Sequence, residues 1–188
     1  MNEFLGLYPA WLEPGIGAGW VIGFIATIHV LFSHASVGAA LVFAWLARRA
    51  VTANQPQHLD FIRKYGAFLL IFSYVLGSVT GPGIWFAATI ANPRGISALI
   101  HNFVWLWATE WVFFLIEVAG VYLLVYLAGR VPIKTYLRYC TIFALSSVGT
   151  LLIIVGILSF MLWPGQDSWY QTGGVLSAFF GESMFAQL

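Results

Sequence analysis

Charged residues are scarce in this chain. Only 8% of its residues are Asp, Glu, Lys or Arg, whereas an ordinary soluble domain carries about 25%. Hydrophobic residues reach 61% and aromatic residues 18%, which is more than a water-soluble fold can hide in its core. These proportions exclude an ordinary soluble domain and indicate a protein whose surface faces lipid.

Cysteine and net charge are also low, which limits the cofactors and partners that the chain can bind. Cys140 is the single cysteine, so no disulfide can form within the chain. The sequence has no Cys-x-x-Cys-His, the motif that covalent c-type haem attachment needs. Any haem would therefore be bound non-covalently. The net charge of +1 is too low for contacts with many phosphates, so nucleic acid is not an expected partner.

Four long apolar stretches cover about residues 17–47, 66–91, 98–128 and 136–163. Each exceeds the roughly 20 residues that a spanning helix needs. The sequence therefore predicts an all-α fold, a multi-pass transmembrane four-helix bundle in a single domain. The apolar run over 173–188 is too short to span, so it is either an interfacial helix on the outer surface or the start of a further segment.

The positively charged residues are unevenly distributed. Seven of the eight flank the first and third predicted loops: Arg48, Arg49, Arg63, Lys64, Arg130, Lys134 and Arg138. Arg94 lies alone on the opposite side. Because basic loops are retained on the cytoplasmic side, we expect the loops over 48–64 and 130–138 inside and both termini outside. The expected location is the cytoplasmic (inner) membrane.

Glycine spacing predicts close helix packing. A Gly-x-x-x-Gly-x-x-x-Gly ridge runs from Gly15 to Gly23, and Gly77 and Gly81 form a second pair. Small residues four apart let transmembrane helices approach closely. Pro82 follows the second pair, and because proline has no backbone N–H, we expect the second predicted helix to bend or to be interrupted there.

Four ionisable residues lie well inside the predicted spans, away from their ends: His29 and His34 in the first, and Glu110 and Glu117 in the third. A carboxylate in the bilayer is costly unless it is paired, protonated or faces a polar cavity, so both glutamates are candidates for proton transfer. They are seven residues apart and share a helix face, about 10 Å from each other. Counted from the outer ends of their spans, His29 lies at the depth of Glu110, and His34 lies at the depth of Glu117. If the first and third predicted helices are neighbours, we expect two layers, each with one histidine and one glutamate.

A neutral imidazole is a suitable axial ligand for haem iron, so His29 is a candidate metal ligand. The alternative is a histidine hydrogen-bonded to a neighbouring helix. His34 lies about 140° around the helix from His29, so the two cannot bind one iron from opposite sides. His101 is either an interfacial polar residue or a contact to a quinone or haem propionate. Trp107 belongs to an aromatic belt or lines a porphyrin or quinone site.

Two of the predicted helices carry sequence patterns of a known family. The first contains His29-Val-Leu-Phe followed by Ser36-Val-Gly-Ala-Ala-Leu, and the second contains Thr80-Gly81 with Phe86. These patterns resemble the first two core helices of subunit I of the cytochrome bd quinol oxidases.

The other two predicted helices extend the resemblance. The third contains Phe113-Phe114-Leu115-Ile116-Glu117 with Arg130 beyond it, and the fourth ends at Trp163-Pro164-Gly165. They are similar to the glutamate-bearing helix of that subunit and to the span after it. The resemblance covers nearly all of this chain and about the first half of the subunit.

The resemblance implies a haem of the b or d type with His29 as its axial ligand, and a quinone as a further cofactor. It implies proton delivery or haem contact for Glu110 and Glu117. The later helices of the family, with the remaining haem ligands and the quinol-binding loop, have no counterpart here. We therefore expect a subunit of a quinol-linked oxidoreductase and not a complete enzyme.

The leading hypothesis is a haem-bearing membrane subunit of a respiratory electron-transfer complex. It would move electrons from quinol to oxygen or to another redox subunit. One alternative is a haem-free membrane scaffold that anchors redox partners, in which His29 binds nothing. The other is a small proton-coupled transporter, in which Glu110 and Glu117 carry protons without electron transfer.

Overall fold

The computed structural model describes residues 15–162, so the predicted segment 173–188 lies outside the described residues. Within this range the chain is helical and contains no strand. The elements are α2 (Ala18–Thr52), α3 (Gln57–Leu69), the π-helix η1 (Leu70–Val75), α4 (Leu76–Ala91), α5 (Pro93–Leu127) and α6 (Ile133–Leu162). The predicted all-α fold is confirmed.

Four of the described helical segments are long and apolar enough to cross a membrane. The second of them, Gln57–Ala91, joins α3, η1 and α4 without a break. It begins nine residues before the predicted start at residue 66, so Arg63 and Lys64 lie in a helix and not in the expected loop. The helix extends past the apolar stretch because its hydrogen bonds are internal and no proline or glycine lies between Gln57 and Gly66.

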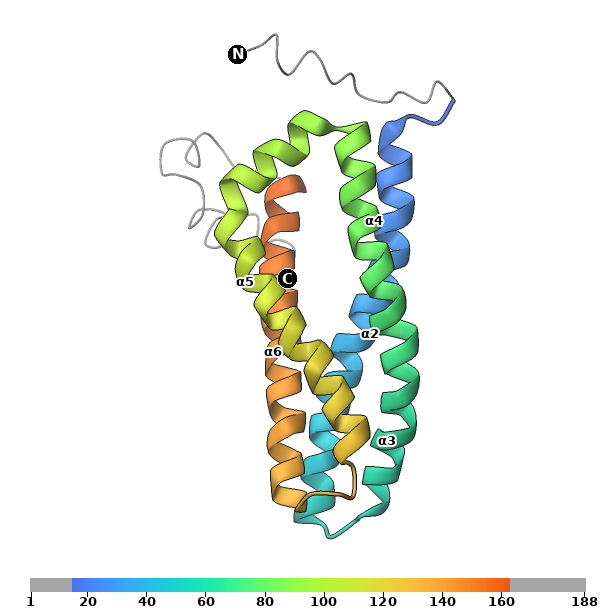
Figure 1. Ribbon diagram of the computed structural model, residues 1–188, viewed down its shortest axis with the longest axis vertical. Helices are drawn as coiled ribbons and strands as arrows, with labels where there is room; N and C mark the ends of the chain where they lie inside the picture. Colours follow the sequence, from blue (N-terminus) through green and yellow to red (C-terminus); the bar gives the residue numbers. More distant parts are fainter. Residues whose placement is uncertain (1–14, 163–188) are drawn as a thin grey trace.

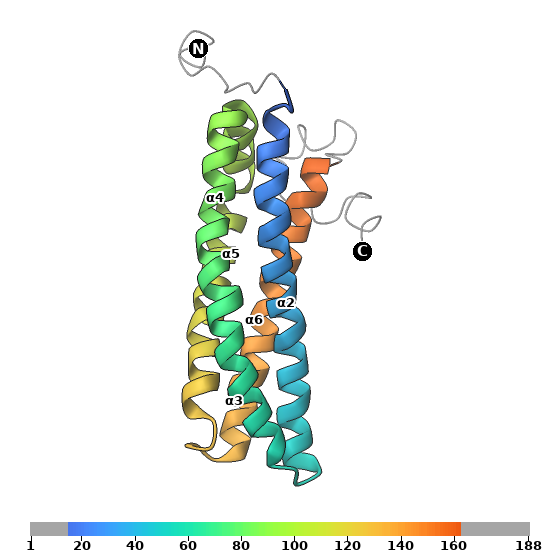
Figure 2. The same ribbon diagram turned by 90° about the vertical axis from the view of Figure 1, so that its right-hand side faces the viewer.

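The helices form a ring in which neighbours in sequence are neighbours in space (Figures 1 and 2). α2 packs against α4 and α6, and α5 packs against α6 and α3. α2 and α5 are therefore diagonal to each other. The described chain begins and ends at one end of the bundle, and the α2–α3 and α5–α6 turns lie at the other end (Figure 1).

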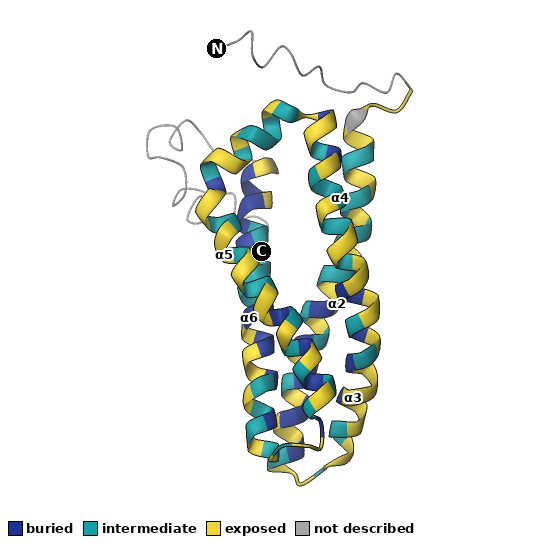
Figure 3. Ribbon diagram, viewed as in Figure 1, coloured by how far each residue is buried: buried dark blue, intermediate teal, exposed yellow. Residues whose placement is uncertain are grey.

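The end of the bundle with these two turns has a continuous hydrophobic core. Its largest fully buried side chains include Phe143, Tyr136 and Leu124, which pack with Phe43 and Ile62 from the first two spans. Figure 3 shows buried residues of every span gathered there. We call this end the closed half.

At the other end the helices separate into two pairs, α2 with α4 and α5 with α6 (Figure 1). α5 has a non-helical residue at Phe103, and Phe103 packs with Ile153, Ile157 and Phe160 of α6. Large side chains here are exposed, including Trp105 at 79%. We call this end, from Ala18 to Ser33 on α2 and from Pro93 to Trp111 on α5, the open half.

Two expectations about local structure were wrong. α4 continues through Pro82 without interruption, and the departure from α-helical geometry lies earlier, in η1. Gly19 and Gly23 do not pack against another helix, because a Cβ at either position would have no described atom within 4 Å. Of the second pair, Gly77 is equally open whereas Gly81 lies under a side chain of α2.

Candidate functional site

His29 points from α2 to α4. Its Nδ1 lies 2.9 Å from Thr80 Oγ1, and the Thr80 hydroxyl lies 2.9 Å from Leu76 O one turn back. When Nδ1 carries the ring proton, the Thr80 hydroxyl donates its own proton to Leu76 O. Thr80 Oγ1 then accepts the Nδ1–H of His29. This assignment leaves the lone pair of His29 on Nε2.

The His29 imidazole contacts α4 at Gly81. A Cβ at this position would lie 3.3 Å from His29 Cε1, a distance tighter than ordinary contact. The ring therefore rests on helix backbone, and Thr80 fixes its rotation. One turn nearer the membrane surface, Ile25 packs where a Cβ on Gly83 would lie, at 3.5 Å. α2 and α4 thus hold His29 in one orientation.

The donor set at His29 fits the haem that the sequence predicts. Haem ligands bind iron through a neutral ring nitrogen while the other nitrogen donates a hydrogen bond that fixes the tautomer. With its proton on Nδ1, His29 has this arrangement, and the residue is half-buried. Over residues 15–162 no three His, Cys, Asp or Glu side chains gather into a group that could hold a metal ion. A haem needs only an axial ligand from the protein, because the porphyrin supplies the other nitrogens.

Glu117 lies at the top of the closed half and is only 3% exposed. Tyr74 of η1 donates its hydroxyl hydrogen to Glu117 Oε2 at 3.0 Å. Thr150 of α6 donates to Oε1. Both carboxyl oxygens thus have partners from two other spans, so the carboxyl group joins three of the four helices.

More hydroxyl groups surround this carboxyl. Ser36 of α2 and Ser147 of α6 lie beside the Tyr74 hydroxyl. Ser147 is fully buried, and its Oγ is not in hydrogen-bond geometry with any described atom. We call Ser36, Tyr74, Glu117, Ser147 and Thr150 the hydroxyl cluster. All four spans contribute to it.

The π-helix accounts for the position of Tyr74. A π-turn adds a residue to a helical turn and so rotates the side chains that follow. Within η1, Ser73 and Tyr74 are the buried residues, and Tyr74 packs against Phe143 and Phe114. Such turns occur frequently at functional sites.

Glu110, the other glutamate that the sequence offered for proton transfer, has a different environment. It is half-buried, and no hydrogen bond or ion pair joins it to any residue in the described range. Trp107 is nearby on α5 and packs edge to face on Trp85 of α4, with ring centroids 5.0 Å apart. The buried Nε1 of Trp107 also has no described partner. The open half therefore holds a carboxyl group and an N–H donor that the described residues leave unpaired.

The two expected histidine–glutamate layers do not form. The layers were expected only if the first and third spans are neighbours. In the structure α6 packs against α2, so α2 and α5 lie diagonally across the bundle. His34 is exposed, and its Nδ1 donates to Val30 O of its own helix at 3.0 Å. Glu117 takes its partners from η1 and α6 instead.

His101 and Trp107 differ in their surroundings. His101 is exposed on α5, with its Nδ1 donating to Ser97 O at 3.1 Å. Trp107 faces another helix and not the surface. Sequence analysis missed Tyr74 and Thr150 as partners of Glu117. A tyrosine in mid-span is the available signal, because membrane tyrosines concentrate at the interfaces.

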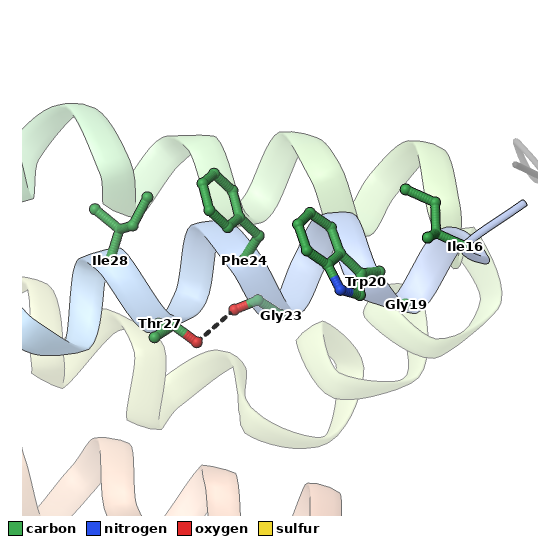
Figure 4. Close-up of a pocket in the computed structure, with 7 residues that line it drawn as sticks. All are labelled: Ile16, Gly19, Trp20, Gly23, Phe24, Thr27 and Ile28. Carbon is green, nitrogen blue, oxygen red and sulfur yellow. Dashed lines mark hydrogen bonds between the residues drawn. The ribbon is translucent and has the colours of Figure 1, made fainter.

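A hollow runs along the outer part of α2 (Figure 4). It is lined by Ile16, just before α2, and by residues of α2 that include Gly19, Trp20, Gly23 and Phe24. His29 is not among the lining residues, so this hollow is separate from the His29 site.

Comparison of the chain with family models, curated proteins and solved structures gives no match. The functional argument therefore depends on the site itself.

Proposed function

We propose that this chain is a haem-bearing membrane subunit of a respiratory electron-transfer complex, similar to the first half of cytochrome bd subunit I. His29 would hold the haem through its imidazole, in the open half. The observation that carries the proposal is the contact of His29 Nδ1 with Thr80 beside Gly81: with the ring proton on Nδ1, Nε2 is the nitrogen that would bind iron.

The environment of Glu110 supports the same location. A polar side chain without partners is costly within a membrane, and both Glu110 and the Trp107 N–H lie in the open half without one. A bound haem or quinone has oxygen atoms that can accept from Trp107. Glu110 then exchanges protons on the open side of the bundle. The haem itself supplies reversible one-electron transfer.

The hydrogen bonds of Glu117 favour a role for this residue other than contact with the haem. Its two oxygens both accept hydrogen bonds from hydroxyl groups. Of the two functions that the sequence allowed, haem contact or proton transfer, this arrangement favours the second. Within the proposed complex, quinol is the electron donor, and oxygen or another redox subunit is the acceptor. Other membrane subunits supply the remaining haem and quinol sites.

The test is the haem content of the purified complex, measured as the pyridine haemochrome, in the wild-type protein and in His29→Ala. We expect at least a tenfold loss of haem in His29→Ala. The matched control is His34→Ala on the same helix, which removes an exposed imidazole and should retain the wild-type content. Thr80→Val should retain part of the haem, because it frees the ring without removing the ligand.

The other outcomes separate the alternatives. Wild-type protein without haem contradicts the proposal and favours the scaffold. Equal haem in wild-type and His29→Ala contradicts the ligand assignment. Proton movement that needs Glu110 and Glu117 in a protein without haem would identify the transporter.

A further inference from the structure

The end of the bundle with the two turns carries exposed cations in two groups. The α2–α3 basic cluster consists of Arg48, Arg49, Arg63 and Lys64, and the α5–α6 basic cluster consists of Arg130, Lys134 and Arg138. All seven side chains are exposed. Each group has an arginine beside an exposed aromatic ring, Arg49 by Trp45 and Arg130 by Tyr126, and the groups differ in the negative charge near them.

Among residues 15–162, negative charge at this end of the bundle is present only at the first cluster. Asp60 lies in the first turn of α3, three residues before Arg63. The remaining acids in the described range, Glu110 and Glu117, lie within the third span, far from this end. The α5–α6 cluster therefore has three cations and no described anion.

The placement of these cations is unfavourable without an anion. Lys134 and Arg138 are four residues apart on α6, where like charges repel. Lys134 also lies in the first turn of α6, where the helix dipole disfavours a cation and no acidic residue is present. No salt bridge relieves this charge anywhere in residues 15–162. A bound anion from outside the protein would relieve it.

The turn that presents these cations has a fixed conformation. Tyr136 is buried, and its hydroxyl donates to Leu124 O at 2.9 Å across the turn. Gly129 supplies the positive φ of 75° that the turn requires. The Arg130 guanidinium lies 4.3 Å from the centre of the Tyr126 ring. The backbone of the turn is therefore fixed, and Arg130 is placed by its contact with Tyr126.

An exposed aromatic surface adjoins the charges. Tyr126 and Tyr122 stack with centroids 6.0 Å apart and planes at 6°, and both are more than half exposed on α5. Tyrosine at the membrane interface packs against lipid near the headgroups. A single ligand with an anionic head and an apolar chain matches both features.

We propose that the α5–α6 basic cluster binds the headgroup of an anionic phospholipid, with its acyl chain along Tyr122 and Tyr126. The lipid phosphate lies among Arg130, Lys134 and Arg138, and the site is a defined one and not a general property of the basic end. This inference does not depend on the haem.

The test is native mass spectrometry of the purified protein in detergent, titrated with phosphatidylglycerol or with phosphatidylcholine. We expect phosphatidylglycerol to bind more tightly than phosphatidylcholine. Each Lys or Arg near a membrane surface contributes about 1 kcal/mol to the attraction of anionic lipid. The variant Arg130→Gln/Lys134→Gln/Arg138→Gln should therefore bind phosphatidylglycerol about 100-fold more weakly.

Three variants sharpen the result. Arg48→Gln/Arg49→Gln/Arg63→Gln removes the same charge from the other cluster and should leave the affinity within about twofold of wild type. Arg130→Lys/Arg138→Lys keeps all three charges and should retain binding. Arg138→Gln alone, which perturbs insertion least, should weaken binding about fivefold.

Equal affinity for the two lipids in the wild-type protein would overturn the proposal. So would an unchanged affinity in the variant Arg130→Gln/Lys134→Gln/Arg138→Gln. An equal loss from either cluster would also overturn it, because it would show a diffuse basic surface without a defined site.

Discussion

The closed and open halves of this bundle use similar residues in opposite ways. In the closed half, side chains from all four spans meet, and Glu117 has a hydrogen-bond partner on each oxygen. In the open half the helices pair two by two, and Glu110 has no described partner. The same residue type on the same helix is therefore part of the packing at one level and free to act on a ligand at the other.

The difference shows how the fold divides its tasks. The closed half holds the four helices together through buried aromatic and aliphatic side chains. The open half has a smaller buried cluster, made by Phe103 with Ile153, Ile157 and Phe160 of α5 and α6. The His29 site lies in this half, held by contacts between α2 and α4 alone.

The largest effect should come from the core of the closed half. Phe143 is fully buried and packs against Tyr74 and Gly120. Phe143→Ala should lower the free energy of unfolding by about 3 kcal/mol. Phe86 of the open half is 70% exposed, and Phe86→Ala should change stability by less than about 0.5 kcal/mol. Both can be measured by SDS titration in mixed micelles, and equal losses would remove the distinction between the halves.

The two glutamates should differ next. Glu117→Ala leaves the Tyr74 and Thr150 hydroxyl groups without their acceptor and should cost about 2 kcal/mol. Glu110→Ala breaks no described hydrogen bond and should be close to neutral in protein without bound cofactor. The same titration measures both, with Glu117→Gln as the control that keeps an acceptor oxygen. A larger loss for Glu110→Ala would contradict the assignment of partners.

The smallest effect concerns two glycines of α4. Gly77→Ala adds a methyl group in open space and should stabilise the protein by about 0.5–1 kcal/mol, because alanine favours a helix. Gly81→Ala adds the same group at 3.3 Å from His29, so it should gain less and displace the imidazole. Thermal unfolding measures the first effect and the haem spectrum the second. Equal gains with unchanged spectra would show that His29 does not rest on Gly81.

Composition was sufficient to predict the fold class. Long apolar runs with few charges allow little except spanning helices, and the structure has four. The ends were predicted less well, because helices such as α3 continue past the apolar stretch, where residue composition gives no signal. The effect of Pro82 was also predicted wrongly, since a helix within a membrane span can continue through a proline.

The site could be predicted only in part. Ionisable residues within spans are rare, so His29, Glu110 and Glu117 stood out from the sequence. Their partners depend on which helices are adjacent and on helix rotation. Neither the diagonal position of α5 nor the π-turn that buries Tyr74 has a simple sequence signal. For this reason His34 was paired with Glu117, although it faces outwards.

The most direct test of the central claim compares one substitution in each half by the reduced-minus-oxidised visible spectrum of the purified complex. With the haem bound at His29 in the open half, His29→Ala should lose the haem bands, and Glu117→Gln in the closed half should retain them with unchanged positions. Retained bands in His29→Ala, or an equal loss in both variants, would contradict the account.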